Sequence, residues 1–222
     1  MTYRGVLFDL DGTLLDTLED LACATNAALT RLGFPGHPVE QYKLWIGDGI
    51  DNLIRSVLPP THCDPATLSA CGALIREEYG RGWFLRTRPY PGVEPLLNAL
   101  AARHFPAAIL SNKPHDLAGK CVARLLPTGQ FAAVLGQRPE VPRKPHPAGA
   151  LEIARQLGLR PDEMAYLGDT GTDMQTATAA GMYAVGALWG FRTAQELQAA
   201  GAQKLIAHPE ELLAILGAQA TA

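Results

Sequence analysis

The segment VLFDLDGTLLDT, residues 6–17, carries the clearest structural signal in the sequence. Three apolar residues run into an acid, a second acid stands two positions later, and a Gly-Thr pair follows. A short apolar run of this kind indicates a strand buried on both faces, as in a parallel sheet. Two carboxylates at the end of such a strand cost free energy unless something neutralises them. Asp9 and Asp11 therefore raise the question of what holds them together.

Similar apolar runs recur along the chain and alternate with helical patterns. The runs lie at residues 107–110, 132–135, 165–168 and 183–188. Apolar residues at helical spacing lie between them, at residues 93–100, 150–157 and 174–180. Strand–helix alternation from about residue 89 onward predicts an α/β fold with a doubly wound parallel sheet.

The segment between the first and second strands is much longer than a crossover requires. Helices are expected at residues 18–32, 39–45, 50–57 and 66–79, and no buried strand is expected among them. One helix normally suffices to connect two parallel strands. We therefore expect a catalytic core of residues 1–16 and 89–222 and an inserted, all-helical cap domain of residues 17–88.

Composition excludes several classes of function. The 222 residues are 47% hydrophobic and 18% charged with a net charge of −3, so the chain can bury a core but offers no basic surface for nucleic acid. The four cysteines are scattered, which argues against a disulfide framework or a thiolate metal site. No apolar run reaches the length of a membrane span. We expect a cytoplasmic protein without membrane or nucleic-acid partners, as a monomer or homodimer.

Polar residues follow the expected strands where an open α/β sheet forms its sites, beyond the carboxyl ends of the strands. Four carboxylates gather there, and they require a hard, oxygen-liganded cation such as Mg²⁺. A carboxylate shielded by Mg²⁺ can attack phosphorus. A neighbouring acid can protonate the leaving alkoxide and then, as a base, activate water. A hydroxyl and a lysine can hold phosphate oxygens. The residues concerned are Asp9, Asp11, Thr13, Ser111, Lys144, Asp169 and Asp173.

The motifs DLDGT, SNK, KP and GDTGTD resemble, in order, the four motifs of the haloacid dehalogenase superfamily. The resemblance implies a Rossmann-like core with a helical cap after the first motif. It implies that Asp9 is the nucleophile and Asp11 the general acid/base. It also implies a Mg²⁺ site formed by Asp9, the backbone carbonyl of Asp11 and Asp169, with Asp173 contacting the ion directly or through water. The residues expected to bind phosphate are Thr13, Ser111, Asn112 and Lys144.

The acid at position 11 separates branches of this superfamily. Dehalogenase relatives carry an aromatic residue there and ion-pumping ATPases a lysine, whereas an acid favours phosphatases that act on small phosphorylated metabolites. The cap stretch WIGDGI resembles the Trp-x-Gly-x-Gly stretch of phosphoglycolate phosphatases, which makes 2-phosphoglycolate the favoured substrate. Trp45, Gly47 and Gly49 are then specificity candidates. The alternative interpretation is a helix-connecting turn with a packed tryptophan.

Two other functions remain open at this point. A sugar phosphomutase would share every core residue, and a receiver-like module phosphorylated on aspartate would also place acids, a hydroxyl and a lysine around Mg²⁺. Receiver modules are shorter and have no helical insert in the first crossover. Lys113, which follows Ser111 and Asn112, is a candidate catalytic residue, but the favoured interpretation is a surface residue at the start of a helix.

Overall fold

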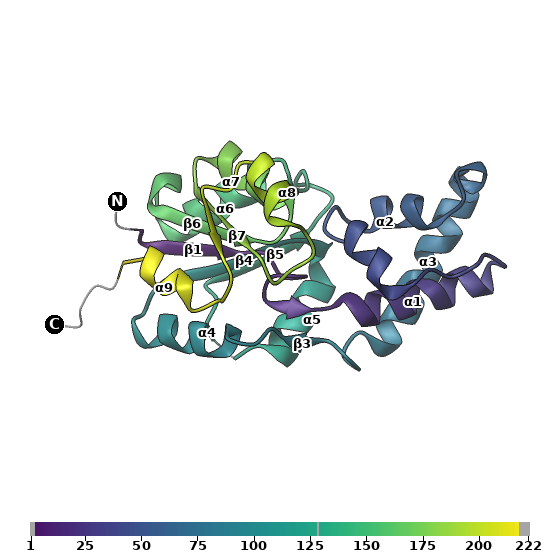
Figure 1. The fold of residues 1–222 in the computed structure, drawn as a ribbon, viewed down its shortest axis with the longest axis horizontal. Coiled ribbons are helices and arrows are strands. Elements are labelled where there is room, and N and C mark those ends of the chain that lie inside the picture. The colour runs from purple at the N-terminus through teal and green to yellow at the C-terminus, as the bar shows by residue number, and fades with distance from the viewer. Residues whose placement is uncertain (1–2, 128, 218–222) are drawn as a thin grey trace. The chain divides into compact units, whose positions relative to one another are not determined.

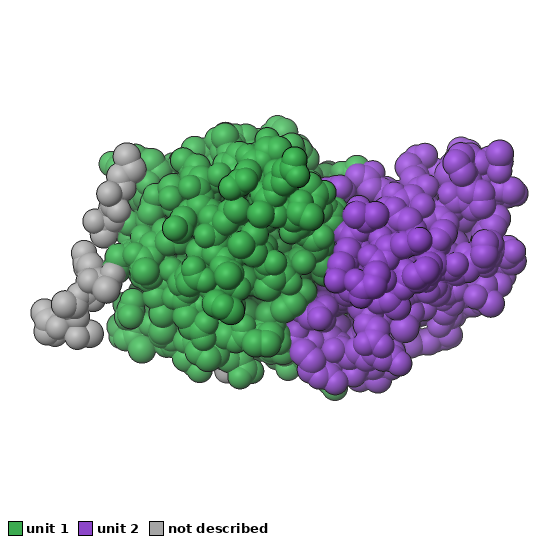
Figure 2. All heavy atoms as spheres, viewed as in Figure 1, with its two compact units in different colours: residues 1–15, 89–222 green, residues 16–88 purple. Residues whose placement is uncertain are grey.

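The computed structural model describes residues 3–127 and 129–217. The chain divides into two compact units, coloured separately in Figure 2. The first, called the core unit here, comprises Met1–Leu15 and Pro89–Ala222. The second, called the helical unit, comprises Asp16–Arg88. No helix among the described residues is both long enough and apolar enough to cross a membrane.

A six-stranded sheet organises the core unit. Every neighbouring pair is parallel, and the strand order is β5-β4-β1-β6-β7-β8. This arrangement confirms the predicted parallel sheet, although β8 was not predicted. The strands are β1 (Gly5–Phe8), β4 (Ala107–Pro114), β5 (Ala133–Gln137), β6 (Met164–Gly168), β7 (Tyr183–Ala187) and β8 (Lys204–Ile206).

Helices cover both faces of this sheet, as the doubly wound fold requires (Figure 1). One face carries α4 (Val93–Ala102), α5 (His115–Leu125) and α9 (Glu211–Ile215). The other carries α6 (Ala148–Leu157), α7 (Gly171–Ala180) and α8 (Ala194–Ala199), and a short 3-10 turn, η3 (Pro161–Glu163), precedes β6. The predicted helices α4, α6 and α7 are confirmed.

Burial on both faces explains the apolar strands. Val6, Leu7 and Phe8 of β1 have no exposed surface. Leu7 belongs to a cluster with Ile153 of α6 and Met174 of α7, which packs those helices against the sheet. From β1 the chain continues to β4 and β5 on one side of it, and then crosses to β6, β7 and β8 on the other side. The strand order therefore reverses at β1, and a binding crevice is expected at the carboxyl end of this strand.

The helical unit contains the predicted helices with one correction. It comprises α1 (Leu18–Arg31), η1 (Val39–Leu44), α2 (Ile50–Val57), η2 (Pro60–His62) and α3 (Pro65–Gly82). The segment expected as a helix at 39–45 is the 3-10 helix η1, which Pro38 precedes. Two short strands, β2 (Leu15–Asp16) and β3 (Arg88–Pro89), pair at the boundary between the units.

Asp20 joins the first helix of the helical unit to the last residues of that unit, and its removal should destabilise the protein. Its buried carboxylate accepts hydrogen bonds from the backbone N–H groups of Arg86 and Thr87 and from the Thr87 hydroxyl, at 2.8–3.2 Å. Asp20→Ala leaves these donors without that acceptor, so we expect a loss of about 3 kcal/mol. Urea denaturation measures it. Glu40→Ala, at an exposed ion pair with Lys43, is the control and should change stability by under about 0.5 kcal/mol.

Candidate active site

Three adjacent strands deliver the predicted motif residues to one edge of the sheet. Asp9 directly follows β1, Ser111 lies within the carboxyl-terminal part of β4, and Asp169 directly follows β6. The pairing of β1 with both β4 and β6 places these three chain segments side by side. Residues more than 150 positions apart in the sequence therefore meet at the point where the strand order reverses.

Three aspartates form a buried cluster at this edge. Asp9, Asp169 and Asp173 each offer one carboxylate oxygen, and these oxygens lie within 4.8 Å of one another. The Lys144 ammonium group joins two of them: Nζ lies 2.7 Å from Asp9 Oδ1 and 2.6 Å from Asp173 Oδ1. All four residues are at least 96% buried. The structure thus brings together four of the residues that the sequence singled out.

The carboxylates of this cluster can all ionise together only if a further cation offsets their charge. Burial and the charge of Asp173 raise the pKa of Asp9 well above its usual value, although Lys144 opposes the shift. Burial, followed by the charge of Asp173, raises the pKa of Asp169 to about 7. Burial alone would lower the pKa of Lys144, but Asp173 and Asp9 raise it. When all three carboxylates are ionised, the one ammonium group leaves two negative charges unbalanced, and the all-oxygen donor set suits Mg²⁺.

The first turn of α7 fixes Asp173. Its Oδ2 accepts hydrogen bonds from the backbone N–H and the hydroxyl of Thr170, at 3.0 and 2.6 Å, while Thr170 caps the helix through the Asp173 N–H. The Tyr166 hydroxyl donates to Asp173 Oδ1 at 3.1 Å. These contacts hold the carboxylate rigid beneath Lys144. Thr170 and Tyr166 were not among the predicted site residues.

A loop after β7 supports Asp169 from the other side. The Phe191 N–H donates to Asp169 Oδ2 and the Thr13 hydroxyl donates to Oδ1, both at 2.8 Å. Trp189 donates from its indole nitrogen to the carbonyl of Thr13 at 2.9 Å. A side chain at Gly190 would collide with Asp169, since an added Cβ would lie 2.2 Å from the aspartate Cβ. Thr13, predicted to bind phosphate, is thus placed against the aspartate cluster, and its phosphate role stays a prediction.

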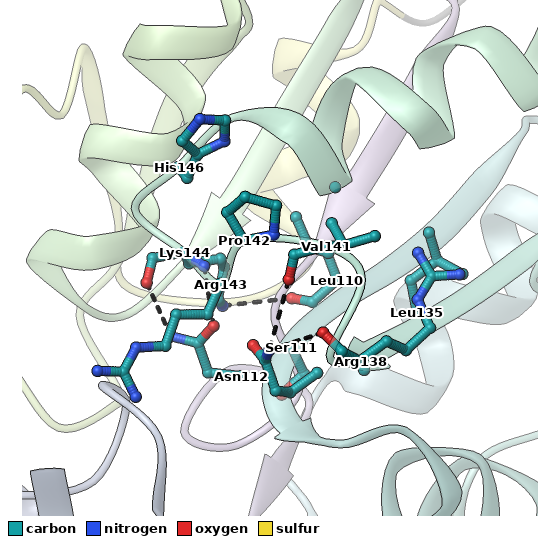
Figure 3. Close-up of a pocket in the computed structure, with 13 residues that line it drawn as sticks. Leu110, Ser111, Asn112, Leu135, Arg138, Val141, Pro142, Arg143, Lys144 and His146 are labelled. Carbon is teal, nitrogen blue, oxygen red and sulfur yellow. Dashed lines mark hydrogen bonds between the residues drawn. The ribbon is translucent and has the colours of Figure 1, made fainter. Parts of the chain in front are cut away.

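Ser111, Asn112 and Lys144 converge beside a small hollow that is also lined by Leu110 and residues 135–138 and 141–143 (Figure 3). The Asn112 carboxamide clamps the backbone of Lys144: it accepts from the Lys144 N–H at 3.0 Å and donates to the carbonyl at 3.2 Å. Ser111 is 4% exposed. Asn112 therefore positions Lys144, while the Ser111 hydroxyl accepts a hydrogen bond from the Lys113 N–H at 3.2 Å.

The expectation that Lys113 is a surface residue was wrong. Strand β4 continues through Lys113 to Pro114, so the lysine points into the protein instead of starting a helix. Its Nζ lies 2.8 Å from Asp11 Oδ1, and the two side chains are only 3% and 11% exposed. The predicted general acid/base is therefore joined to a buried cation, which supports the less favoured interpretation of Lys113 as a residue of the site.

Trp45, Gly47 and Gly49 lie in the helical unit. The Trp45 ring packs edge-on against His37 and Tyr42, with ring centroids 4.9 and 5.3 Å apart. Gly47 and Gly49 both have positive φ, at 118° and 88°. This packing agrees with the alternative interpretation of a structural tryptophan, and the specificity role of the three residues stays a prediction.

Comparisons with known proteins identify the family of the chain. A family model described as haloacid dehalogenase-like hydrolase matches residues 6–187. The phosphoglycolate phosphatase of Yersinia pestis is 30% identical over 216 residues, covering 96% of this chain and 93% of the relative. That of Escherichia coli (strain K12) is 31% identical over 233 residues, covering 96% and 92%. The structure of a predicted phosphoglycolate phosphatase from Haemophilus somnus matches with a TM-score of 0.90 at 26% identity, covering 98% and 99%.

The matches extend over nearly the whole chain and include all four motif segments. They also agree with the parallel core and its helical insertion. The chain therefore belongs to the haloacid dehalogenase-like hydrolase family, and it is a phosphoric monoester hydrolase that resembles the phosphoglycolate phosphatases.

Proposed function

We propose that the protein is a Mg²⁺-dependent phosphomonoesterase that hydrolyses 2-phosphoglycolate through an aspartyl-phosphate intermediate. The observation that carries the proposal is the buried cluster of Asp9, Asp169 and Asp173 joined by Lys144. Such a cluster has the donor atoms for a divalent cation and keeps one of its carboxylates, Asp9, at the end of the central strand. The backbone carbonyl of Asp11 would complete the protein ligands.

The chain's own groups can carry both halves of the reaction. An Asp9 oxygen attacks phosphorus while the bond from phosphorus to the ester oxygen breaks, and Asp11 gives a proton to the departing alkoxide. Asp11, now ionised, then takes a proton from water. The resulting hydroxide attacks the phosphoryl group and releases inorganic phosphate and free Asp9. When bound, Mg²⁺ would shield the negative charges of the nucleophile and the phosphate from each other.

The substrate assignment rests on the relatives and on the helical unit. The proteins of Yersinia pestis and Escherichia coli that align over almost the full chain are phosphoglycolate phosphatases. We assign the helical unit as a cap domain that selects the substrate, with Trp45, Gly47 and Gly49 as candidates for that role. A small, carboxylated leaving group such as glycolate agrees with this assignment.

Release of inorganic phosphate from a panel of small phosphate esters tests the proposal. We expect hydrolysis of 2-phosphoglycolate and, more slowly, of a generic aryl phosphate, abolished by excess chelator and restored by added Mg²⁺. Activity that persists in chelator would contradict the metal requirement. A rearranged sugar phosphate without phosphate release would identify a phosphomutase instead, and a phosphoaspartate that survives for minutes in Mg²⁺ would indicate a receiver-like module.

The effect of Mg²⁺ on stability should depend on pH. The pKa of an Asp side chain in an unfolded chain is about 3.9. In the folded, metal-free protein the pKa of Asp169 is raised to about 7. The folded state then binds more protons than the unfolded state, so this contribution to stability is complete below pH ~4 and is lost as the pH rises through about 7.

Bound Mg²⁺ requires ionised carboxylates, so the rise in melting temperature caused by Mg²⁺ should increase between pH 5 and 8. Thermal denaturation with and without added Mg²⁺ measures the effect. The pH range is chosen to bracket the pKa of about 7 for Asp169. A Mg²⁺ effect that stays constant with pH would show that Asp169 does not lose a proton on binding.

A further inference from the structure

Lys113 contacts two residues of the site, Asp11 and Ser111, which belong to different sequence motifs. Its ammonium group donates to Asp11 Oδ1 at 2.8 Å, and its backbone N–H donates to Ser111 Oγ at 3.2 Å. The two residues that it contacts come from different strands, since Asp11 follows β1 and Ser111 lies in β4. The lysine side chain is 3% exposed, so the ion pair is shielded from water and is not a surface contact.

We propose that Lys113 is a positioning residue that holds the Asp11 carboxylate in the orientation needed for proton transfer to the leaving group. The inference deepens the proposed function and rests on it, because it assigns Asp11 as the general acid/base. Lys113 itself touches neither the phosphoryl group nor its bonds in this proposal. It acts through the carboxylate.

The two oxygens of Asp11 have different surroundings. Oδ1 is held by Lys113, whereas the hydrogen bonds found among residues 3–127 and 129–217 leave Oδ2 without a partner. The side chain keeps 11% of its surface exposed, so the carboxylate is not fully enclosed. A carboxylic acid transfers its proton from one oxygen at a time. Fixing Oδ1 therefore leaves Oδ2 as the oxygen that carries and transfers the proton.

Backbone hydrogen bonds hold the turn around Asp11. The Gly12 N–H donates to the Leu15 carbonyl at 2.8 Å, and the Leu14 and Leu15 N–H groups donate to the Leu10 carbonyl at 3.0 and 2.9 Å. The tight turn that follows Asp11 thus holds its main chain, and Lys113 holds the end of its side chain. Together they leave the carboxylate little freedom, and positioned groups transfer protons more effectively than mobile ones.

The step that Lys113 would assist is the first half of the reaction. The bond from Asp9 to phosphorus forms and the ester bond from phosphorus to oxygen breaks. The proton on Asp11 Oδ2 moves to the alkoxide, and Asp11 becomes a carboxylate that faces the Lys113 ammonium group. An alkoxide needs this proton in order to leave, whereas 4-nitrophenolate is stable as an anion and leaves without it.

The experiment compares kcat/KM for ethyl phosphate and 4-nitrophenyl phosphate in Lys113→Met, Asp11→Asn and the wild type, with Mg²⁺ present. The ratio kcat/KM reports steps up to departure of the leaving group, so the later use of Asp11 as a base does not enter it. We expect Lys113→Met to lower kcat/KM about 100-fold for ethyl phosphate and under about five-fold for 4-nitrophenyl phosphate. Asp11→Asn should show the same selective loss.

Three comparisons separate positioning from a general structural role. The ratio of the two substrates within one preparation does not depend on how much of the variant has folded. In the Asp11→Asn background, Lys113→Met should add under about two-fold to the loss, because residues that act as a unit are not additive. Lys113→Arg keeps the charge and should recover part of the activity on ethyl phosphate. Lys120→Met, at an exposed lysine on α5, is the matched control and should behave as the wild type.

Equal losses on both substrates, or full additivity with Asp11→Asn, would overturn the proposal. A loss confined to 2-phosphoglycolate, with ethyl phosphate unaffected, would also overturn it and would assign Lys113 to the substrate carboxylate. A wild-type enzyme that hydrolyses neither test ester nor 2-phosphoglycolate would contradict the proposed function itself, which distinguishes that failure from a failure of the positioning role.

Discussion

Asp9→Asn is expected to abolish hydrolysis, with kcat falling on the order of 10⁵-fold. The substitution keeps the size and shape of the side chain but replaces a nucleophilic oxygen with an amide that cannot form a stable acyl phosphate. Because Asp9 lies 2.7 Å from Lys144 and within the three-carboxylate cluster, the change also weakens the proposed metal site. Release of phosphate from 2-phosphoglycolate at saturating Mg²⁺ measures the effect.

The same variant should remain folded. Burial and Asp173 raise the pKa of Asp9, which means that the folded, metal-free protein disfavours a negative charge at this position. A neutral amide removes that penalty, so the metal-free variant should melt no lower than the wild type. Asp116→Asn, at an exposed aspartate on α5, is the matched control and should keep full activity. Activity above about 1% of the wild type in Asp9→Asn would require another nucleophile.

Much of the fold was predictable because its strongest signals are local. A run of apolar residues that stops at an acid marks the end of a buried strand, and this pattern located β1 and β6 and the aspartates that follow them. Gly158 and Gly181 end α6 and α7 in the left-handed conformation, which is the usual role of a glycine directly after a helical pattern. Two of the unpredicted elements, β8 and α9, are only three and five residues long and have little periodicity to detect.

The site was predictable where chemistry follows a strand directly and unpredictable where a strand continues through polar residues. The apolar run of β4 ends at Leu110, so Ser111, Asn112 and Lys113 resembled a loop. The strand in fact extends to Pro114, with an irregular register against β5 after Leu110. A lysine one position beyond two polar residues carries no sequence signal that its amine faces a carboxylate 102 positions away.

The contacts of Trp189, Gly190 and Phe191 around Asp169 could not be predicted from the sequence for a related reason. These contacts join a loop after β7 to residues after β1 and β6, and two of them use backbone atoms, which any residue type supplies. The exclusion of a side chain at Gly190 depends on the position of Asp169 in three dimensions. Neither composition nor motif spacing predicts that close approach.

Lys144→Met is the variant expected to affect stability and activity together. The lysine donates to Asp9, Asp173 and the Leu110 carbonyl from a position that is 4% exposed. Methionine fills a similar volume but leaves the buried carboxylates without their cation. Removal of one partner from a buried ion pair costs about 3–5 kcal/mol, and we expect a loss of this size in the metal-free protein by urea denaturation. Lys120→Met should lose under about 0.5 kcal/mol.

Added Mg²⁺ should restore the stability of Lys144→Met but not its activity. Without the ammonium group, the carboxylates of Asp9 and Asp173 lose the cation that contacts them at 2.7 and 2.6 Å, so their attraction for a divalent cation increases. The rise in melting temperature caused by Mg²⁺ at pH 8 should therefore be larger in the variant than in the wild type.

Catalysis should nevertheless stay about 10³-fold lower, because the methionine cannot donate hydrogen bonds to the transferring phosphoryl oxygens. These two results together identify Lys144 as both the structural counter-ion of the metal-free cluster and a phosphate ligand in the reaction. A variant that Mg²⁺ returns to full activity would retain only the first of these roles. A Mg²⁺ effect no larger than in the wild type would instead show that Lys144 and the metal do not compensate the same charges.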